Sequence, residues 1–151
     1  MKKYVVHLIV VMFVLVFGSS SWADTFLQGS VSGTWAPSGN PYYVIDDCTV
    51  PSGQLLTILP GVIVNIGEDL QIVVQGRIEA IGTFDQRIVF KAPSDSIYWK
   101  YILVDAGPSQ GVSRFEYCDL TNAETGIYLK ICCKRQGTMT ANIKNCGSSP
   151  N

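Results

Sequence analysis

Between Tyr42 and Ile143 the apolar residues occur in short bursts, and turn-forming residues separate the bursts. Many residues in the bursts are β-branched, which is typical of short strands joined by turns. We find no amphipathic helical pattern, so we predict an all-β chain of many short strands. The expected strands are Tyr42–Ile45, Leu55–Leu59, Val62–Ile66, Leu70–Val74, Arg77–Ile81, Arg87–Phe90, Tyr101–Val104, Ser113–Tyr117, Gly126–Ile131 and Met139–Ile143. The expected turns are Pro51–Gly53, Pro60–Gly61, Gly67–Asp69, Gly76, Gly82 and Ala106–Pro108.

Two all-β architectures compete for such a chain. A sandwich uses fewer and longer strands that alternate cleanly between two faces. A solenoid needs very short strands, a turn at every corner and a repeat of about 20–30 residues. Here the strands are short, and the sequence of Phe115–Cys118 is echoed 28 residues later by Ile143–Cys146. Two further segments, Thr49–Gly53 and Gly61–Val64, also have related sequences. The solenoid is therefore favoured.

The N-terminus carries an export signal. Lys2 and Lys3 precede an apolar stretch from Val5 to Phe17, and Ala23 offers a small residue before Asp24. That stretch is shorter than the roughly 20 residues that a helix needs to span a bilayer. No cysteine lies at the cleavage point, which argues against a lipoprotein. We therefore predict that residues 1–23 are a signal peptide and that the protein is secreted, extracellular or at the cell surface, without a stable membrane anchor.

Removal of that segment changes the charge and the chemistry available. Two of the 11 Lys and Arg residues leave with it, so nine face 12 Asp and Glu, a net charge of about −3. A mildly acidic chain gives nucleic acid no electrostatic reason to bind. His7 is the single histidine and leaves as well, which excludes Ser-His and Cys-His nucleophilic pairs and His-ligated metals from the mature chain.

All five cysteines lie after the predicted signal, where disulfides persist. Five is an odd number, so at least one thiol stays free or pairs with another chain. Stacking of Cys118 and Cys146 on successive coils would bring their α-carbons within the range of a disulfide, and two buried thiols are an equal alternative. A zinc site using these two with Cys132 and Cys133 has enough ligands but lacks the C-x-x-C knuckle, so no metal is expected.

Several segments carry a resemblance to known proteins. They are Gly33–Tyr42, Thr49–Gly53, Leu56–Val62, Gly76–Thr83, Ile88–Phe90 and Phe115–Ile127. Together they resemble the N-terminal portion of secreted bacterial right-handed parallel β-helix proteins, over about Gly29 to Leu129. The chain departs from that pattern at Lys100 and across Ile131–Arg135. The resemblance implies an all-β right-handed parallel β-helix and says little of function, because lyases, hydrolases and adhesins share such coils.

The expected organisation follows from this reading. Residues 24–43 would be an N-terminal cap segment, and residues 44–151 would be the coils. One coil cannot bury its own apolar face, so an exposed end must be capped. The chain stops at Asn151 where a further strand is expected. We therefore expect either a chain that is incomplete at its C-terminal end or a capping partner there.

Charged residues supply the weak catalytic candidates. The resemblance includes polysaccharide lyases, which abstract a proton with a basic side chain and often hold Ca²⁺ through Asp and Glu oxygens. Asp105, Arg114, Glu116 and Asp119 are the residues that would do so here, and a solvated charged surface is the alternative explanation. Asp46 and Asp47 are a second acidic pair, but neighbours on a strand point to opposite faces, so we expect them in a turn.

Aromatic residues supply the candidate ligand contacts, because exposed rings stack on sugar faces. Strand alternation would place Trp99 and Tyr101 on one face and Tyr98 on the other, with core packing as the alternative for whichever face is inward. Tyr42 and Tyr43 carry the same ambiguity. We therefore expect an exported, non-enzymatic β-helix that is structural or binds glycans or cell-surface components, without a cofactor. The alternative is the N-terminal part of a polysaccharide lyase or glycoside hydrolase whose catalytic coils lie beyond residue 151.

Overall fold

The computed structural model describes residues 24–107, 110–130, 141–144 and 146–148. Its strands are β1 (Thr25–Ser30), β2 (Gly33–Trp35), β3 (Tyr42–Val50), β4 (Leu55–Ile58), β5 (Ile63–Ile66), β6 (Ile72–Val74), β7 (Arg77–Ile81), β8 (Ile88–Lys91), β9 (Trp99–Val104), β10 (Ser113–Glu116), β11 (Cys118–Leu120), β12 (Ala123–Leu129), β13 (Ala141–Lys144) and β14 (Gly147–Ser148). A short 3₁₀ helix, η1 (Pro37–Gly39), precedes β3. The expected signal peptide, including Ala23, lies outside the described residues, as do Cys132 and Cys133. In the described part of the chain, no helix is long and apolar enough to cross a membrane.

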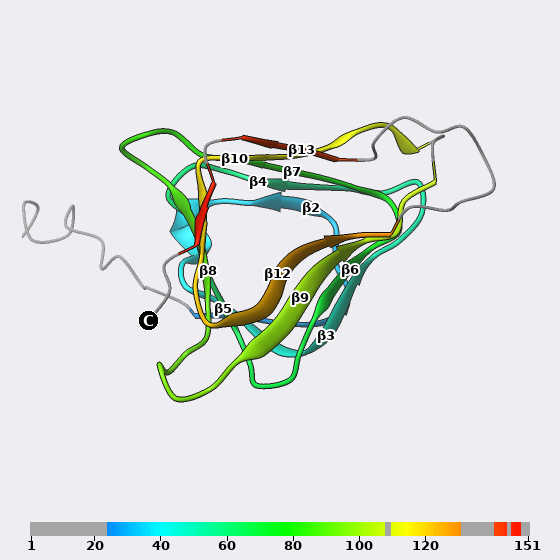
Figure 1. Ribbon diagram of the computed structural model, residues 1–151. Helices are drawn as coiled ribbons and strands as arrows, with labels where there is room; N and C mark the ends of the chain where they lie inside the picture. The colour runs from blue at the N-terminus through cyan, green and yellow to red at the C-terminus, as the bar shows by residue number, and fades with distance from the viewer. Residues whose placement is uncertain (1–23, 108–109, 131–140, 145, 149–151) are drawn as a thin grey trace, which may run out of the picture.

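The strands form two sheets in which every pairing is parallel. One sheet has the order β13-β10-β7-β4-β2, and the other runs β12-β9-β6-β3-β5-β8-β11-β14. Strand β3 bends, because its first half pairs with β5 and its second half with β6. The larger sheet therefore folds around a corner into two walls. Viewed down the stack, the walls enclose a roughly triangular outline (Figure 1).

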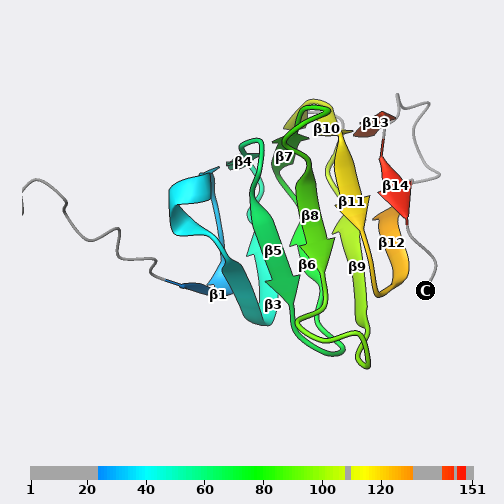
Figure 2. The same ribbon diagram turned by 90° about the vertical axis from the view of Figure 1, so that its left-hand side faces the viewer.

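Successive strands lie on the three walls in a repeating order. Strands β4, β5 and β6 make one coil, β7, β8 and β9 the next, and β10, β11 and β12 the one after. Phe115 pairs with Ile143, and Glu116 with Lys144, so the repeat in the sequence does mark one coil. The predicted all-β solenoid is therefore confirmed for the described residues, and the two-sheet sandwich is wrong. From the side, the strands of neighbouring coils lie parallel along each wall (Figure 2).

Apolar side chains of similar kind stack inside the triangle. On the wall of β3, β6, β9 and β12, for example, Val50, Val74 and Val104 are in register. On the wall of β5, β8 and β11, Val64, Phe90 and Leu120 are in register. These residues are buried, and they belong to one continuous core that all the coils share. Since strands within a sheet lie about 4.8 Å apart, each inward side chain contacts the equivalent one on the next coil.

The segment predicted as an N-terminal cap is joined to the first coil by hydrogen bonds. Strand β1 pairs with β3 along the edge that β5 and β6 leave open, and β2 pairs with β4. Asn40 donates to the Gly61 carbonyl over 2.8 Å and accepts from the Ile63 N–H over 2.8 Å. The segment therefore adds paired strands to the solenoid and covers the exposed edge of β3.

Burial of the stacked side chains predicts the cost of removing one. Phe90 is fully buried, whereas Phe84 lies in the turn before β8 and is 79% exposed. Phe90→Ala should lower the free energy of unfolding by about 3–5 kcal/mol, because it leaves a cavity between coils. Phe84→Ala is the matched control and should change that energy by less than about 0.5 kcal/mol. Urea unfolding followed by tryptophan fluorescence measures both, and equal losses would contradict this account of the core.

Close stacking of the corners predicts a second effect. A Cβ added at Gly76 would press on the backbone carbonyl oxygens of Gln54 and Pro51, which cannot rotate away. Gly53 also lies at a corner, but a Cβ there meets nothing within 4 Å, and only its φ of +79° disfavours a side chain. We expect Gly76→Ala to cost about 3 kcal/mol and Gly53→Ala about 1 kcal/mol. In thermal unfolding, Gly76→Ala should therefore have a lower midpoint temperature than Gly53→Ala. The reverse order would contradict the corner geometry.

Candidate functional site

The four charged catalytic candidates are spread over all three walls. Asp105 directly follows β9, Arg114 and Glu116 lie on β10, and Asp119 lies on β11. Asp105 accepts a hydrogen bond from the Lys130 ammonium at 2.8 Å, and Asp119 accepts one from Arg87 Nε at 2.8 Å. The structure therefore does not bring the four side chains to one point.

The second acidic pair lies where β3 bends. Asp46 and Asp47 are exposed residues inside β3, rather than in a turn between strands. Asp46 Oδ1 accepts a hydrogen bond from the backbone N–H of Asp47 at 2.8 Å. The Asp47 carboxylate accepts two from Gln71, at 3.0 Å from its backbone N–H and 2.8 Å from its side-chain amide. Each carboxylate thus stabilises the corner backbone. Over the described ranges, no three His, Cys, Asp or Glu side chains gather in a way that could hold a metal ion.

Trp99 and Tyr101 do not share a face, so that prediction is wrong. Trp99 is fully buried, and its indole N–H donates to the Thr121 carbonyl at 2.8 Å. Within β9 the buried residues Trp99 and Ile102 are three positions apart, so the alternation is interrupted between them. Strand β12 carries an irregularity opposite this point, where Ala123 pairs with Trp99 but Gly126 with Tyr101. Trp99 therefore belongs to the core, and its ring is closed to a ligand in this structure.

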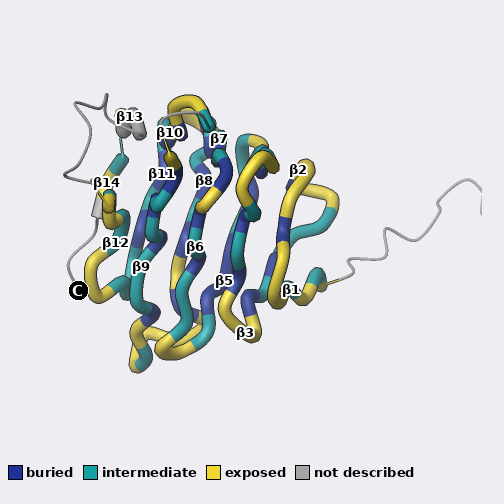
Figure 3. The backbone as a smooth tube through the Cα atoms, turned by 90° about the vertical axis from the view of Figure 1, so that its right-hand side faces the viewer, coloured by how far each residue is buried: buried dark blue, intermediate teal, exposed yellow. Residues whose placement is uncertain are grey.

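Tyr101 instead belongs to the outer surface of the wall of β3, β6, β9 and β12. Outward residues Thr49, Val73, Leu103 and Tyr128 are in register across the four strands. The rings of Tyr101 and Tyr128 contact each other with centroids 6.1 Å apart and planes inclined by 52°. We call Val73, Tyr101, Leu103 and Tyr128 the tyrosine face. Figure 3 looks onto this wall, where β3, β6 and β9 run side by side.

The tyrosine face is bordered by one ion pair and by Lys100 on β9, which has no ion pair among the described residues. Its Tyr128 is 51% exposed, while Val73, Tyr101 and Leu103 are half-buried. The ion pair of Asp105 and Lys130 lies at the end of the wall where β9 and β12 finish. Gly126 is opposite Tyr101 and has no side chain with which to cover it. The result is a flat surface that offers two aromatic rings and two aliphatic side chains.

The remaining aromatic candidates have other surroundings. Tyr42 is buried and stacks on Trp35 with centroids 5.2 Å apart, and its hydroxyl donates to the Ala36 carbonyl at 2.9 Å. Tyr43 stacks on the exposed Phe26 near the first strands, with centroids 5.5 Å apart. Tyr98 is 50% exposed and precedes β9. Sequence alternation had not singled out Tyr128, because its contact with Tyr101 depends on the register between β9 and β12.

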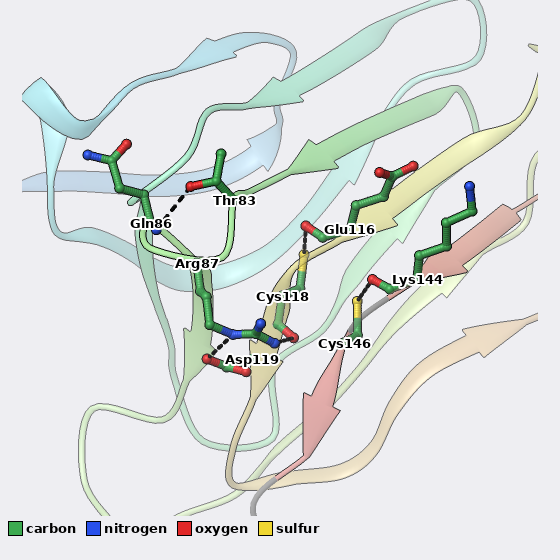
Figure 4. A network of polar contacts seen from close by, with 8 residues as sticks. All are labelled: Thr83, Gln86, Arg87, Glu116, Cys118, Asp119, Lys144 and Cys146. Atoms are coloured by element: carbon green, nitrogen blue, oxygen red, sulfur yellow. Dashed lines mark hydrogen bonds and ion pairs between the residues drawn. The ribbon is translucent and has the colours of Figure 1, made fainter.

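A second polar cluster surrounds two thiols (Figure 4). Cys118 and Cys146 lie at equivalent places on successive coils, and both are free thiols. Cys118 is fully buried and Cys146 half-buried. Arg87 directly precedes β8. It pairs with Asp119, donates to the Cys118 carbonyl at 3.3 Å and lies 5.9 Å from the centre of the Tyr117 ring.

This geometry shifts the pKa values of the two thiols in opposite directions. The neighbouring Cys118 thiol, with the charge of Arg87 among the smaller causes, lowers the pKa of Cys146 to about 6. The neighbouring Cys146, followed by burial, raises the pKa of Cys118 far above its ordinary value. The hydrogen bond to Asp119 also raises the pKa of Arg87, which keeps that guanidinium charged. Of the two thiols, Cys146 is therefore the one that gives up its proton more readily.

Comparisons with known proteins add little to this geometry. No protein-family model matches the chain, and no solved structure matches it. A stretch of 68 residues, 45% of the chain, is 37% identical to Protein bark beetle of Drosophila melanogaster. That stretch spans 2% of the Drosophila protein. A match of this extent assigns no family, so the arrangement of the side chains is the basis for a functional proposal.

Proposed function

We propose that this protein is an exported, non-catalytic glycan-binding module and that the tyrosine face is its binding surface. The observation that carries the proposal is the contacting pair Tyr101 and Tyr128 on the outside of a flat parallel sheet. An outward wall position in a solenoid needs only a polar side chain, so an aromatic pair there calls for a reason. The C–H-rich faces of sugar rings are suitable partners for exposed aromatic rings, whose hydroxyls stay in water.

The spacing of the surface suits an extended glycan. Strands in the wall are about 4.8 Å apart, and the two tyrosine centroids are 6.1 Å apart, which is comparable with the distance between neighbouring sugar rings in a linear chain. Val73 and Leu103 extend the surface across β6 and β9 in the same register. A linear glycan could therefore cross several coils while keeping one kind of contact.

The charges favour a neutral glycan over an acidic one. Lys130, the cation nearest the described end of β12, is paired with Asp105 at 2.8 Å. Asp47, on the same wall, accepts hydrogen bonds from Gln71. The chain as a whole carries a net charge of −1. A uronate polymer would thus meet a mildly acidic protein, and Lys100 on β9 is the one described cation of this wall without an ion pair.

We also infer the finer architecture and the location. Connections between parallel strands of one sheet are right-handed in about 98% of cases, which supports a right-handed parallel β-helix of the kind that the sequence resembles. The Lys2-Lys3 start, the apolar stretch and Ala23-Asp24 support export and cleavage after Ala23. The partners would then be glycans or other components of the cell surface.

The test is loss of glycan binding from the tyrosine face. Affinity electrophoresis through gels that contain soluble β-glucan, xylan or mannan should retard the protein. Tyr101→Ala or Tyr128→Ala should each weaken the retardation about 3–10-fold, as expected for loss of one aromatic contact. Phe84→Ala removes an exposed ring from another part of the surface and should bind like the parent protein.

Two results would contradict the proposal. One is the absence of retardation in every neutral polysaccharide, or retardation that neither tyrosine substitution reduces. The other is enzymatic: release of unsaturated products from acidic polysaccharides with Ca²⁺, lost on substitution of Asp105 or Arg114, would favour the lyase alternative. Circular dichroism and urea unfolding of each variant would separate loss of binding from loss of fold.

A further inference from the structure

Cys118 and Cys146 are placed to react with each other. Phe115 pairs with Ile143 and Asp119 with Gly147, so the two cysteines face each other between matched parts of adjacent coils. Parallel neighbours in a sheet have α-carbons about 4.8 Å apart, within the 4.4–6.8 Å that a disulfide spans. Figure 4 shows the two side chains next to each other, one on each of the two adjacent coils. Little movement separates this pair of thiols from a cross-link.

Their surroundings differ in a way that assigns the roles. Cys146 is half-buried, and its thiol contacts the carbonyls of Phe115 at 3.5 Å and Lys144 at 3.3 Å. Cys118 is fully buried behind it, and its thiol contacts the carbonyls of Ala80 and Glu116, each at 3.5 Å. A reagent from solvent can therefore reach Cys146 before it reaches Cys118.

The third described cysteine shows what an inert thiol looks like in this fold. Cys48 lies on the inward side of β3, is fully buried and stacks on Ile72. Burial, followed by the charges of Asp46 and Asp47, raises its pKa to about 11. The sulfur of Cys48 contacts the Asp46 carbonyl at 3.6 Å. It is a core residue without access to an oxidant.

We propose that Cys118 and Cys146 form a reversible disulfide cross-link between the coil of β10–β12 and the coil of β13–β14, with Cys146 as the sulfur that exchanges. Its occurrence in the organism rests on the proposed export, because disulfides persist in oxidising compartments. The chemistry itself needs only the folded chain and a small-molecule disulfide. It is independent of glycan binding by the tyrosine face, which lies on another wall.

The reaction proceeds by two exchanges with an oxidant such as oxidised glutathione. The Cys146 thiolate attacks one glutathione sulfur, a mixed disulfide forms, and the first glutathione leaves as a thiolate. Cys118 then gives up its proton and attacks the Cys146 sulfur, so that the second glutathione leaves as a thiolate, which takes up a proton. Two electrons pass from the cysteine pair to the glutathione disulfide. Modification of Cys146 removes a group that raises the pKa of Cys118, which favours the second step.

Peptide mapping of the full chain tests this directly, because trypsin separates the cysteines. Cys118 falls in the peptide of residues 115–130, Cys146 in 145–151, and Cys132 with Cys133 in 131–134. Reduced folded protein should react with iodoacetamide at Cys146, while Cys48 and Cys118 should react only after unfolding. Treatment with oxidised glutathione should link peptides 115–130 and 145–151, and should leave Cys48 as a thiol. In Cys118→Ala, oxidation should stop at the glutathione adduct of Cys146.

The pH dependence of alkylation gives an independent readout. The charged and titratable groups around Cys146 are Cys118, Arg87 directly before β8, Asp119 on β11 and Lys144 on β13. Thiolate is the reactive form, so the alkylation rate of Cys146 should reach half its maximum near pH 6 instead of the ordinary value of about 8.5. Cys118→Ala removes the neighbouring thiol that lowers the pKa of Cys146 and should move that midpoint upward. Cys118→Ser keeps a polar hydroxyl at the same place and should move it less.

Three outcomes would overturn the proposal. The first is a cross-link from Cys146 to peptide 131–134 in place of 115–130. The second is a glutathione adduct on Cys146 that never resolves in the parent protein. The third is an alkylation midpoint near 8.5 that is the same in the parent and both variants. If the chain binds no glycan but forms the cross-link, the proposed function fails and this inference stands. If it binds glycan through the tyrosine face but never forms the cross-link, the proposed function stands and this inference fails.

Discussion

The structure depends on contact between equivalent side chains on neighbouring coils. Valine stacks on valine at Val50, Val74 and Val104, and aliphatic and aromatic side chains stack in the same way on the other walls. Each contact is non-directional and small, and together the contacts fill the triangular interior. Because the strand spacing fixes the distance between coils, a change in register of one coil would disturb the packing of the next. Everything outside the core, including both candidate sites, takes its position from this register.

The two sites use that register differently. The tyrosine face comes from outward residues of β6, β9 and β12, which the core fixes in a flat array. The thiol pair comes from inward residues at an end of the described stack, where Cys146 is only half covered. One arrangement offers a surface for an extended ligand. The other offers two cysteines in register on adjacent coils and a guanidinium beside them.

Local sequence was sufficient to predict the strands and turns. It was insufficient to predict which residues of different strands contact each other. Short β-branched bursts and turn residues correctly predicted strands, because both features act within a few residues. The ion pair of Arg87 and Asp119 joins residues 32 positions apart. The local sequence around either residue does not predict that the two side chains meet. The expectation that Trp99 and Tyr101 share a face was wrong, because the alternation of β9 is interrupted between Trp99 and Ile102, opposite an irregularity in β12. Strands β1, β2, β11 and β14 were not predicted as strands.

The sequence by itself determined that the chain would be all-β, that it would turn every few residues, and that Phe115 and Ile143 would mark successive coils. It also determined the inventory of functional groups, including the loss of histidine with the predicted signal peptide. Only the tertiary structure decided that Tyr101 meets Tyr128, that Trp99 is buried and that the four charged candidates are spread over three walls. The reason is that strand formation depends on neighbouring residues, whereas contacts between walls and coils depend on the register of segments far apart in the chain.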